Sequence, residues 1–410
     1  MVKVAILGFG VVGSGVAEVL SGNGAGIQKK ADELIEVKYI LDVRDFPDSP
    51  FAQHFVKDFS VIEHDPEVNV VVETIGGVGA ALDFTERALK QGKSVVTSNK
   101  ELVATHGRRL LDLAAQNNAV YLFEASVGGG IPILRPLSEC MSANEILEIC
   151  GILNGTANYI FTRMVKDHIP FAEALAGAQA NGYAEQDPSA DVEGKDTCRK
   201  LCILSSIAYG WHLLPDQVPT TGITKITLAD EAYAAAAGKS LKLLGRSIAR
   251  EDGTICAYVE PHFVGNQDPL AGVEDVFNAI KVKGNAVGDV MFYGRGAGKL
   301  PTASAVVADV VDALKNGSKV HDSLFWQPAE PVEGMLTDPA PAAYYVRAAG
   351  VAPAVVEAIY GKGRVVDEHF DGCSYLVEQA DAKAMAEAAR KVETVGGSVK
   401  LVLKKLPEDA

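Results

Sequence analysis

The chain has 410 residues, of which 48% are hydrophobic and 22% charged, and its formal net charge is −15. This length allows two or three domains with separate cores. The acidic balance argues against nucleic acid or an anionic membrane as a partner, and no apolar run reaches the ~18 residues of a membrane span. The six cysteines lack C-x-x-C spacing and the amino terminus resembles no signal peptide, so we expect a cytoplasmic protein.

The first predicted element is an apolar strand, Val2 to Leu7, of the kind that is buried on both faces of a parallel sheet. The motif Gly8-Phe9-Gly10-Val11-Val12-Gly13 follows at once, and a helix is predicted from Ser14 to Leu20. In this setting Gly8 makes a tight turn, Gly10 admits a pyrophosphate and Gly13 allows close packing of helix on sheet. The start of the helix offers free N–H groups to phosphate. The sequence therefore predicts a dinucleotide site at Gly8, Gly10, Val11, Val12 and Gly13, against the alternative of a glycine-rich turn without a ligand.

The second predicted strand, Glu36 to Leu41, ends in both an acid and an arginine. Asp42 would hold the ribose hydroxyls of NAD, whereas Arg44 would suit the 2′-phosphate of NADP, so either cofactor is open. Asp42 lies further from Gly13 than the usual ~20 residues. We explain the extra length by an extended connection from Ser21 to Asp32.

Strands and helices continue to alternate through the first part of the chain. The expected strands are Val68–Glu73, Ser94–Thr97 and Ala119–Phe123, and the expected helices are Gly79–Gln91 and Leu102–Asn117. This order predicts an α/β fold with a doubly wound parallel sheet, whose ligands bind at the carboxyl ends of the strands. Thr74, Ser98 and Lys100 lie at that edge, although Lys100 could also be an ordinary exposed lysine at a helix start.

Charged side chains occur where a later helix should be apolar. We predict a helix from about Val192 to Tyr209, with Asp191 as its N-cap and Gly210 as its end. Asp196 and Lys200 then lie one turn apart, in line with the apolar positions of that helix. A surface ion pair is the simpler alternative, but such pairs usually lie opposite an apolar stripe. The pattern therefore favours a functional site.

Five motifs occur together and in one order, and in combination they resemble the homoserine dehydrogenase family over about residues 1–315. They are the nucleotide motif, T-S-N-K-E-L from Thr97, E-A-S-V-G-G-G-I-P from Glu124, L-N-G-T-A-N-Y-I from Leu153, and Gly-Tyr-Ala-Glu…Asp…Lys from Gly182 to Lys200. The resemblance implies reversible hydride transfer between L-homoserine and NADP or NAD, giving L-aspartate 4-semialdehyde in threonine and methionine biosynthesis.

The resemblance also implies roles for individual residues. Lys200 matches the proton-transfer lysine, and its amine must be less basic than a free lysine, through burial or a second cation such as Lys100 or Arg199. The remaining matches are substrate-binding Glu185, Asp196 and Asp191, cofactor-contacting Gly182 and Gly298, and a sodium-binding loop with backbone carbonyl ligands from Glu124, Val127, Gly129 and Ile131. Asp191 could instead serve only as the helix cap, and relatives carry alanine where Gly129 stands.

The domain organisation is expected to be threefold. A dinucleotide-binding domain covers residues 1–130 and is completed by about 300–330. A strand is expected at Ala286–Tyr293, and the helix that follows it, to Leu314, is expected to pack back on this first domain. An α+β substrate-binding and dimerisation domain covers 131–300. Its helices are expected on one face of its sheet, which leaves the other face free to pair with a second subunit in a homodimer or homotetramer.

After a linker at Val332–Ala340, residues 341–410 are predicted to form a βαββαβ ferredoxin-like domain that resembles regulatory ACT domains. Its expected strands are Ala342–Val346, Arg364–Phe370, Ser374–Gln379 and Ser398–Lys404, and its expected helices are Pro353–Tyr360 and Ala382–Val392. The resemblance implies L-threonine as an allosteric ligand. The loop Ala348–Pro353 lacks the usual Asp-x-Pro-Gly start, so a purely dimerising role is the alternative.

Two other functions compete with this interpretation. One is a different Rossmann dehydrogenase of an amino-acid-derived carbonyl, which would need another substrate cradle than Glu185 and Asp196. The other is a non-enzymatic NAD(P) sensor, which has no use for Lys200 aligned with Asp196. A Lys200→Ala variant separates the sensor from the enzymes, because only an enzyme would lose turnover.

Overall fold

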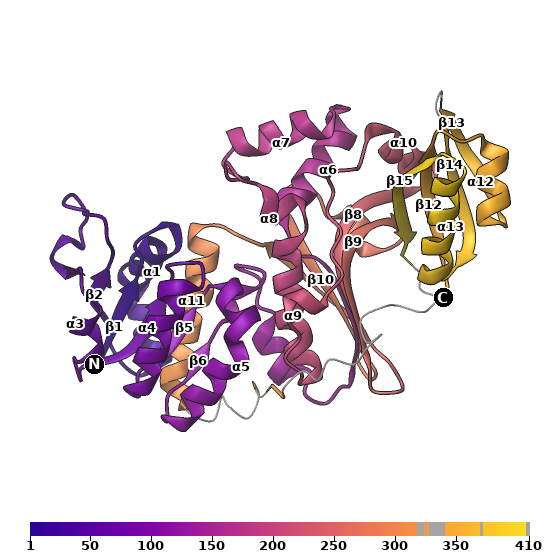
Figure 1. Cartoon of the computed structure of the whole chain (residues 1–410). Helices are drawn as coiled ribbons and strands as arrows, with labels where there is room; N and C mark the ends of the chain where they lie inside the picture. Colours follow the sequence, from indigo (N-terminus) through magenta and orange to yellow (C-terminus); the bar gives the residue numbers. More distant parts are fainter. Residues whose placement is uncertain (318–323, 325, 328–340, 370–371, 407–410) are drawn as a thin grey trace. The chain divides into compact units, whose positions relative to one another are not determined.

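The computed structural model describes residues 1–317, 324, 326–327, 341–369 and 372–406 (Figure 1). The chain divides into two compact units. The first contains Met1–Leu147, Arg199–Asp216 and Val282–Glu330, and the second contains Glu148–Cys198, Gln217–Lys281 and Pro331–Ala410. The predicted linker Val332–Ala340 lies outside the described residues. Within the described residues, every helix is too short or too polar to cross a membrane.

The first unit contains a six-stranded parallel sheet in the order β3-β2-β1-β4-β5-β6. Its strands are β1 (Val2–Leu7), β2 (Ile35–Leu41), β3 (Phe55–Val56), β4 (Val68–Glu73), β5 (Ser94–Thr97) and β6 (Tyr121–Leu122). Its helices are α1 (Val11–Gly22), α2 (Gly24–Ala31), α3 (Ser60–Glu63), α4 (Gly79–Lys90), α5 (Lys100–Gln116) and α11 (Lys299–Asn316). Val4, Ile6, Val71 and Val95 are fully buried in the sheet. The predicted doubly wound sheet is confirmed, and its topological switch point lies between β1 and β4.

The segment between β1 and β2 differs from expectation. The connection predicted as extended contains the short helix α2, which ends at Asp32 in the left-handed conformation (φ 56°). Only Ala31 of α2 is buried, so the segment carries too little apolar pattern to be recognised as a helix.

The helix α11 packs on α1, as expected. A Cβ on Gly15 of α1 would lie 2.9 Å from the carbonyl oxygen of Lys299 and 3.1 Å from Cβ of Ala303. Lys299 also forms an ion pair with Glu18 at 2.7 Å. Residues far apart in sequence therefore complete the first unit, and Figure 1 shows α11 beside α1.

A second, mixed sheet has the order β11-β10-β7-β8-β9-β15-β12-β14-β13. Before the tail its strands are β7 (Ile146–Ile152), β8 (Lys239–Ala249), β9 (Ile255–Gly265), β10 (Phe277–Gly284) and β11 (Gly288–Arg295). The helices of this part are α6 (Gly155–Asp167), α7 (Phe171–Ala180), α8 (Ser189–Val192), α9 (Lys195–Tyr209) and α10 (Leu228–Ala236). Both α6 and α10 pack against β8.

The tail has the predicted βαββαβ order. Its elements are β12 (Ala342–Ala349), α12 (Pro353–Tyr360), β13 (Gly363–His369), β14 (Gly372–Ala380), α13 (Ala382–Thr394) and β15 (Ser398–Lys405). The strands form an antiparallel sheet in the order β15-β12-β14-β13, which is the ferredoxin-like arrangement. Its core includes Val346, Val356, Tyr375 and Val392.

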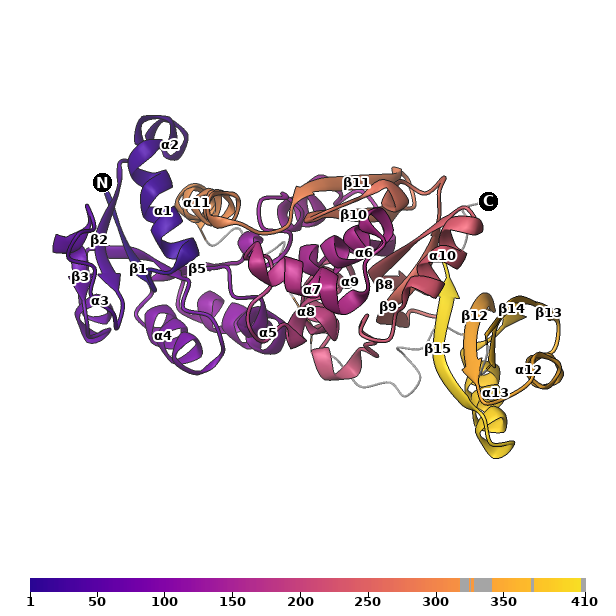
Figure 2. The ribbon, with the colours of Figure 1, turned by 90° about the horizontal axis from the view of Figure 1, so that it is seen from above.

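The tail also continues the sheet that precedes it within the second unit. Strand β15 pairs in parallel with β9 through Lys404 and His262, and Figure 2 shows β15 between β9 and β12. The Tyr345 ring stacks on Tyr233 at 4.9 Å, and its hydroxyl donates to Asp230 at 2.9 Å. These contacts join the tail to the α10–β9 region, and Tyr345 and Asp230 are buried in them.

Candidate active site

The nucleotide motif forms a tight turn followed by an uncapped helix. Gly8 has φ +89°, and a Cβ on Gly13 would lie 1.9 Å from the Gly8 carbonyl oxygen and 2.8 Å from Thr74 Oγ1. A Cβ on Gly10 would meet nothing within 4 Å, so the backbone there faces open space. No side chain caps the start of α1. The first N–H groups of α1, from Val11, Val12 and Gly13, are therefore suited to an anionic group.

The end of β2 holds its acid and its arginine in contact. Asp42 accepts hydrogen bonds from Phe9 N at 2.7 Å, Arg44 N at 2.9 Å and the Arg44 guanidinium at 3.0 Å. The Arg44 guanidinium lowers the pKa of Asp42 to about 2. The Arg44 side chain is 60% exposed, whereas that of Asp42 is 6% exposed. The accessible charge at this edge is therefore cationic.

The residues predicted at the carboxyl ends of β4 and β5 lie in two adjoining loops. Thr74 Oγ1 donates to the carbonyl oxygens of Leu7 and Gly8, at 2.9 and 3.0 Å, so it fixes the nucleotide turn. Ser98 and Lys100 are half-buried, and Lys100 is the first residue of α5. The Asn99 side chain caps α5 by accepting from Leu102 N at 3.1 Å.

Helix α9 carries both charged residues that the sequence singled out. Asp196 is 2% and Lys200 7% exposed, so this is no exposed surface ion pair. Within the first unit, Arg199 forms an ion pair with Glu101 at 2.7 Å, which joins the segment of α9 that contains Lys200 to the start of α5. Lys100 directly precedes Glu101 in the sequence, and Lys200 directly follows Arg199.

Asn154 links the two carboxylates expected to bind substrate. Its Nδ2 donates to Asp191 Oδ1 at 2.6 Å and to Asp196 Oδ2 at 2.9 Å. Its Oδ1 accepts from Ala157 N at 2.7 Å and so caps α6. Asn154 is 5% exposed. Sequence reasoning gave this residue no role, although an Asn directly before a Gly-Thr helix start is a recognisable cap signal.

The predicted helix cap at Asp191 is wrong. Asp191 lies inside the short helix α8, and α9 begins only at Lys195. Gly194, with φ +83°, separates the two helices, and a Cβ there would approach Thr220 at 3.1 Å. The end of α9 at Tyr209 was predicted correctly, and Gly210 follows with φ +72°.

Three further predicted residues lie in glycine-containing loops. Glu185 is exposed in the loop after α7, and its carbonyl oxygen accepts from Gln179 Nε2 at 3.0 Å. Gly182 in the same loop has φ +71° and open space at its Cβ position. Gly298, with φ +127°, precedes α11 and its carbonyl oxygen accepts from Thr302 N at 3.1 Å. Both glycines adopt a conformation that L side chains rarely take.

The loop predicted to bind sodium is held by the side chain of its first residue. The Glu124 carboxylate accepts from the backbone N–H groups of Ile133, Leu134 and Arg135, at 2.7 to 2.9 Å. This carboxylate is therefore engaged, which leaves backbone carbonyls as the donor set of the loop. Gly129 has φ +54°, and a Cβ there would lie 2.6 Å from the Gly296 carbonyl oxygen, so alanine would be strained here. Val127 and Ile131 are buried.

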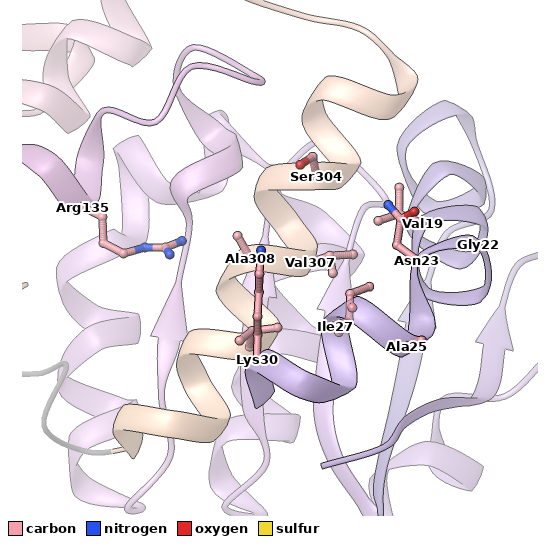
Figure 3. Close-up of a pocket in the computed structure, with 12 residues that line it drawn as sticks. Val19, Gly22, Asn23, Ala25, Ile27, Lys30, Arg135, Ser304, Val307 and Ala308 are labelled. Atoms are coloured by element: carbon pink, nitrogen blue, oxygen red, sulfur yellow. The ribbon is translucent and has the colours of Figure 1, made fainter. Parts of the chain in front are cut away.

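A separate pocket lies in the first unit, between α1, α2 and α11 (Figure 3). Its volume is about 620 Å³, and Val19, Ile27 and Val307 contribute apolar lining, with Lys30 and Arg135 as its charged residues. None of the predicted site residues lines it.

Comparisons with known proteins agree on one family. A family model described as homoserine dehydrogenase matches residues 132–311, and one described as homoserine dehydrogenase, NAD binding domain, matches residues 8–124. A homoserine dehydrogenase of Pseudomonas aeruginosa is 43% identical over 315 residues, which are 77% of this chain and 72% of the relative.

Solved structures extend the likeness to the tail. A homoserine dehydrogenase from Thiobacillus denitrificans has a TM-score of 0.89 and 34% identity, covering 99% of this chain and 98% of its own. A hyperthermophilic archaeal homoserine dehydrogenase mutant in complex with NADPH has a TM-score of 0.64 and 27% identity, covering 76% of this chain and 97% of its own.

Proposed function

This chain belongs to the homoserine dehydrogenase family and is an NAD(P)-dependent oxidoreductase acting on a CH–OH group, and from that premise we propose how its own residues serve the reaction. The reaction interconverts L-homoserine and L-aspartate 4-semialdehyde. The observation that carries the proposal is that Asn154 donates to both Asp191 and Asp196, with Asn154 and Asp196 buried and the buried Lys200 one turn further along α9.

Lys200 is the proton-transfer group in this proposal. Oxidation of the homoserine hydroxyl requires a base to take its proton as hydride leaves the carbon, and the reverse reaction requires the same group as an acid. The nicotinamide, when bound, supplies the hydride acceptor or donor. Lys200 Nζ takes the hydroxyl proton during oxidation and returns it to the carbonyl oxygen during reduction. Its burial keeps bulk water from competing for that proton.

The carboxylates of Asp196 and Asp191 bind the substrate ammonium, and Glu185 joins them from its loop. Two ionised carboxylates close together repel each other, and a substrate cation between them relieves that repulsion. The amide nitrogen of Asn154 donates to one oxygen of each carboxylate and so holds the two carboxylates beside each other for the substrate ammonium. The side chain of Asn154 is in turn fixed by its cap on α6.

The cofactor residues proposed are Gly8, Gly10, Val11, Val12, Gly13, Thr74, Ser98, Lys100, Gly182 and Gly298, with Arg44 at the adenosine ribose. The open backbone at Gly10 and the uncapped start of α1 fit a pyrophosphate. Both oxygens of Asp42 already accept hydrogen bonds, whereas Arg44 is exposed. A guanidinium there suits a 2′-phosphate, which supports NADP as the preferred cofactor.

A sodium ion would be held by the carbonyl oxygens of Glu124, Val127, Gly129 and Ile131. A hard monovalent cation favours oxygen donors without strong net charge, and the loop offers its backbone because the Glu124 carboxylate is engaged elsewhere. The ion would stiffen the loop and would take no part in proton or hydride transfer.

Ligand analogues test the proposed carboxylate cradle. The test measures oxidation of L-homoserine and of 4-hydroxybutyrate, which keeps the hydroxyl and carboxylate but lacks the ammonium, by reduced-nicotinamide absorbance with NAD and NADP in parallel. We expect a strong preference for homoserine, and an Asp196→Asn variant that loses this preference. Equal use of both alcohols by the wild-type enzyme would refute the cradle.

Two properties of the assembly and the tail complete the proposal. We infer a homodimer or homotetramer, supported by β11, on which Met291 and Tyr293 are 39% and 54% exposed. Light scattering of wild type and Tyr293→Glu tests it, and a monomeric wild type would contradict it. The tail is proposed to be an ACT-like module with L-threonine as a candidate effector, which assays with and without millimolar threonine would test.

The proposal also places the enzyme in the cytoplasm. None of the six cysteines, all of which lie in the described residues, forms a disulfide bond, which supports a reducing compartment.

A further inference from the structure

Glu73 is a buried carboxylate at the carboxyl end of β4. It is 0% exposed, and it pairs with Leu7 of β1 and with Thr97 of β5 in the sheet register. Thr97 Oγ1 donates to Oε2 at 2.6 Å, and Ile75 N donates to Oε1 at 2.7 Å. Burial raises the pKa of Glu73, and these hydrogen bonds oppose that shift. A buried carboxylate is costly unless its hydrogen bonds are made, so its presence at the ligand-binding edge needs a cause.

The hydrogen bonds of Glu73 continue into a chain that joins two loops. Thr97 Oγ1 also accepts from Asn99 N at 2.9 Å. Asn99 Nδ2 then donates to the Gly77 carbonyl oxygen at 2.6 Å, while Asn99 Oδ1 caps α5. The loop after β4 is thereby tied to the loop after β5 at both of its ends, by Glu73 at one and by Gly77 at the other.

These two loops carry three of the residues proposed for the cofactor site. Thr74 follows Glu73 directly, and Ser98 and Lys100 flank Asn99. We propose that Glu73 is a positioning residue for hydride transfer, which sets the two loops so that the nicotinamide is held in a productive orientation. This inference rests on the proposed cofactor site and adds a residue that touches neither substrate nor cofactor.

The chemistry of the network explains why a carboxylate is required. The groups that Glu73 contacts are donors, and an ionised carboxylate has only acceptors. A glutamine could still accept from Ile75 N, but its amide nitrogen would face the hydroxyl of Thr97 and, being a donor, could not accept the proton of that hydroxyl. The hydrogen bond that Thr97 donates to Oε2 would be lost without any change of side-chain size.

The test compares Glu73→Gln with wild type in two assays. The first measures kcat for homoserine oxidation and the primary kinetic isotope effect with homoserine deuterated at C4, the carbon from which the hydride leaves. The second measures the affinities of NADP and of 2′-phospho-ADP-ribose, which lacks the nicotinamide. We expect kcat to fall roughly 10- to 100-fold, with a larger isotope effect, because small misplacements of reacting groups cost this much. The affinity for 2′-phospho-ADP-ribose should stay within about twofold of the wild-type value. The amount by which NADP binds more tightly than 2′-phospho-ADP-ribose should be lost in the variant.

Control variants separate the proposed role of Glu73 from general structural damage. Glu231→Gln replaces another buried carboxyl, 4% exposed and in the second unit, and should leave kcat and both affinities unchanged. If Glu73→Gln fails to fold, Thr97→Val should reproduce the loss and Thr97→Ser should restore it. Unchanged kcat and affinities would overturn the proposal, as would an equal loss of fragment and cofactor affinity, which would indicate general structural damage. The binding assay needs no homoserine turnover. Its result therefore tests the role of Glu73 even if homoserine proves not to be the substrate.

Discussion

Asn154 gives the sharpest prediction, because one side chain has two separable tasks. Its amide nitrogen binds the carboxylates of Asp191 and Asp196, and its oxygen caps α6. Asn154→Ser keeps a good helix cap but removes the amide, whereas Asn154→Ala removes both. The two variants therefore separate the substrate cradle from the helix cap.

The magnitudes follow from the contacts. A hydrogen bond to a charged group contributes about 1.5–3 kcal/mol, and every 1.4 kcal/mol corresponds to a factor of ten. Losing the placement of the two carboxylates should lower kcat/KM for homoserine roughly 10- to 100-fold in both variants. The helix cap contributes about 1 kcal/mol, so Ala should be less stable to unfolding than Ser by about that amount.

The assay combines steady-state kinetics with urea unfolding. The KM for NADP should stay near the wild-type value in both variants, because Asn154 belongs to the carboxylate cluster and not to the nucleotide turn. If Asn154→Ser oxidises homoserine as well as wild type does, Asp191 and Asp196 are not the substrate cradle.

Further variants test other parts of the account. Arg44→Ala should raise the KM for NADP roughly 10-fold or more and leave that for NAD nearly unchanged, because a charge-assisted contact to the 2′-phosphate is lost; equal effects on both cofactors would exclude this role. Burial raises the pKa of Glu231 to about 8 from 4.5, so the folded protein keeps a proton that the unfolded chain releases. The stability of wild type should therefore fall as pH rises from 4.5 toward 8, and Glu231→Gln should flatten this decline in denaturation curves. Gly13→Ala should abolish cofactor binding in calorimetry, since its Cβ would lie 1.9 Å from the Gly8 carbonyl oxygen.

Much of the fold could be predicted from local patterns in the sequence. The strand β1, the glycine turn and α1 follow from an apolar run and three spaced glycines, and the order of elements in the tail follows from alternating apolar runs. The helix α2 was missed because it buries little. The break at Gly194 was missed because Val192 and the following residues continue a helical pattern, and the turn depends on close approach to Thr220, which is distant in sequence.

The site was less accessible to sequence reasoning. Asn154 bonds to carboxylates 37 and 42 residues away, a contact that no local pattern reveals. The sequence predicted Glu73 only as the last residue of a strand, because its proposed role depends on Thr97 in the neighbouring strand. Family motifs supplied the roles of Lys200, Glu185 and the cofactor residues, which stay predictions until ligands are bound.

The central claim is that the amine of Lys200 transfers the hydroxyl proton, and the most direct measurement is kcat for homoserine oxidation by Lys200→Ala. Lys195→Ala is the matched control, because Lys195 begins the same helix, is exposed and pairs with Glu193 at 2.5 Å. We predict that Lys200→Ala loses roughly 10²- to 10⁴-fold in kcat while binding NADP normally, and that Lys195→Ala stays near wild type. A Lys200→Ala enzyme that keeps its turnover would contradict the account.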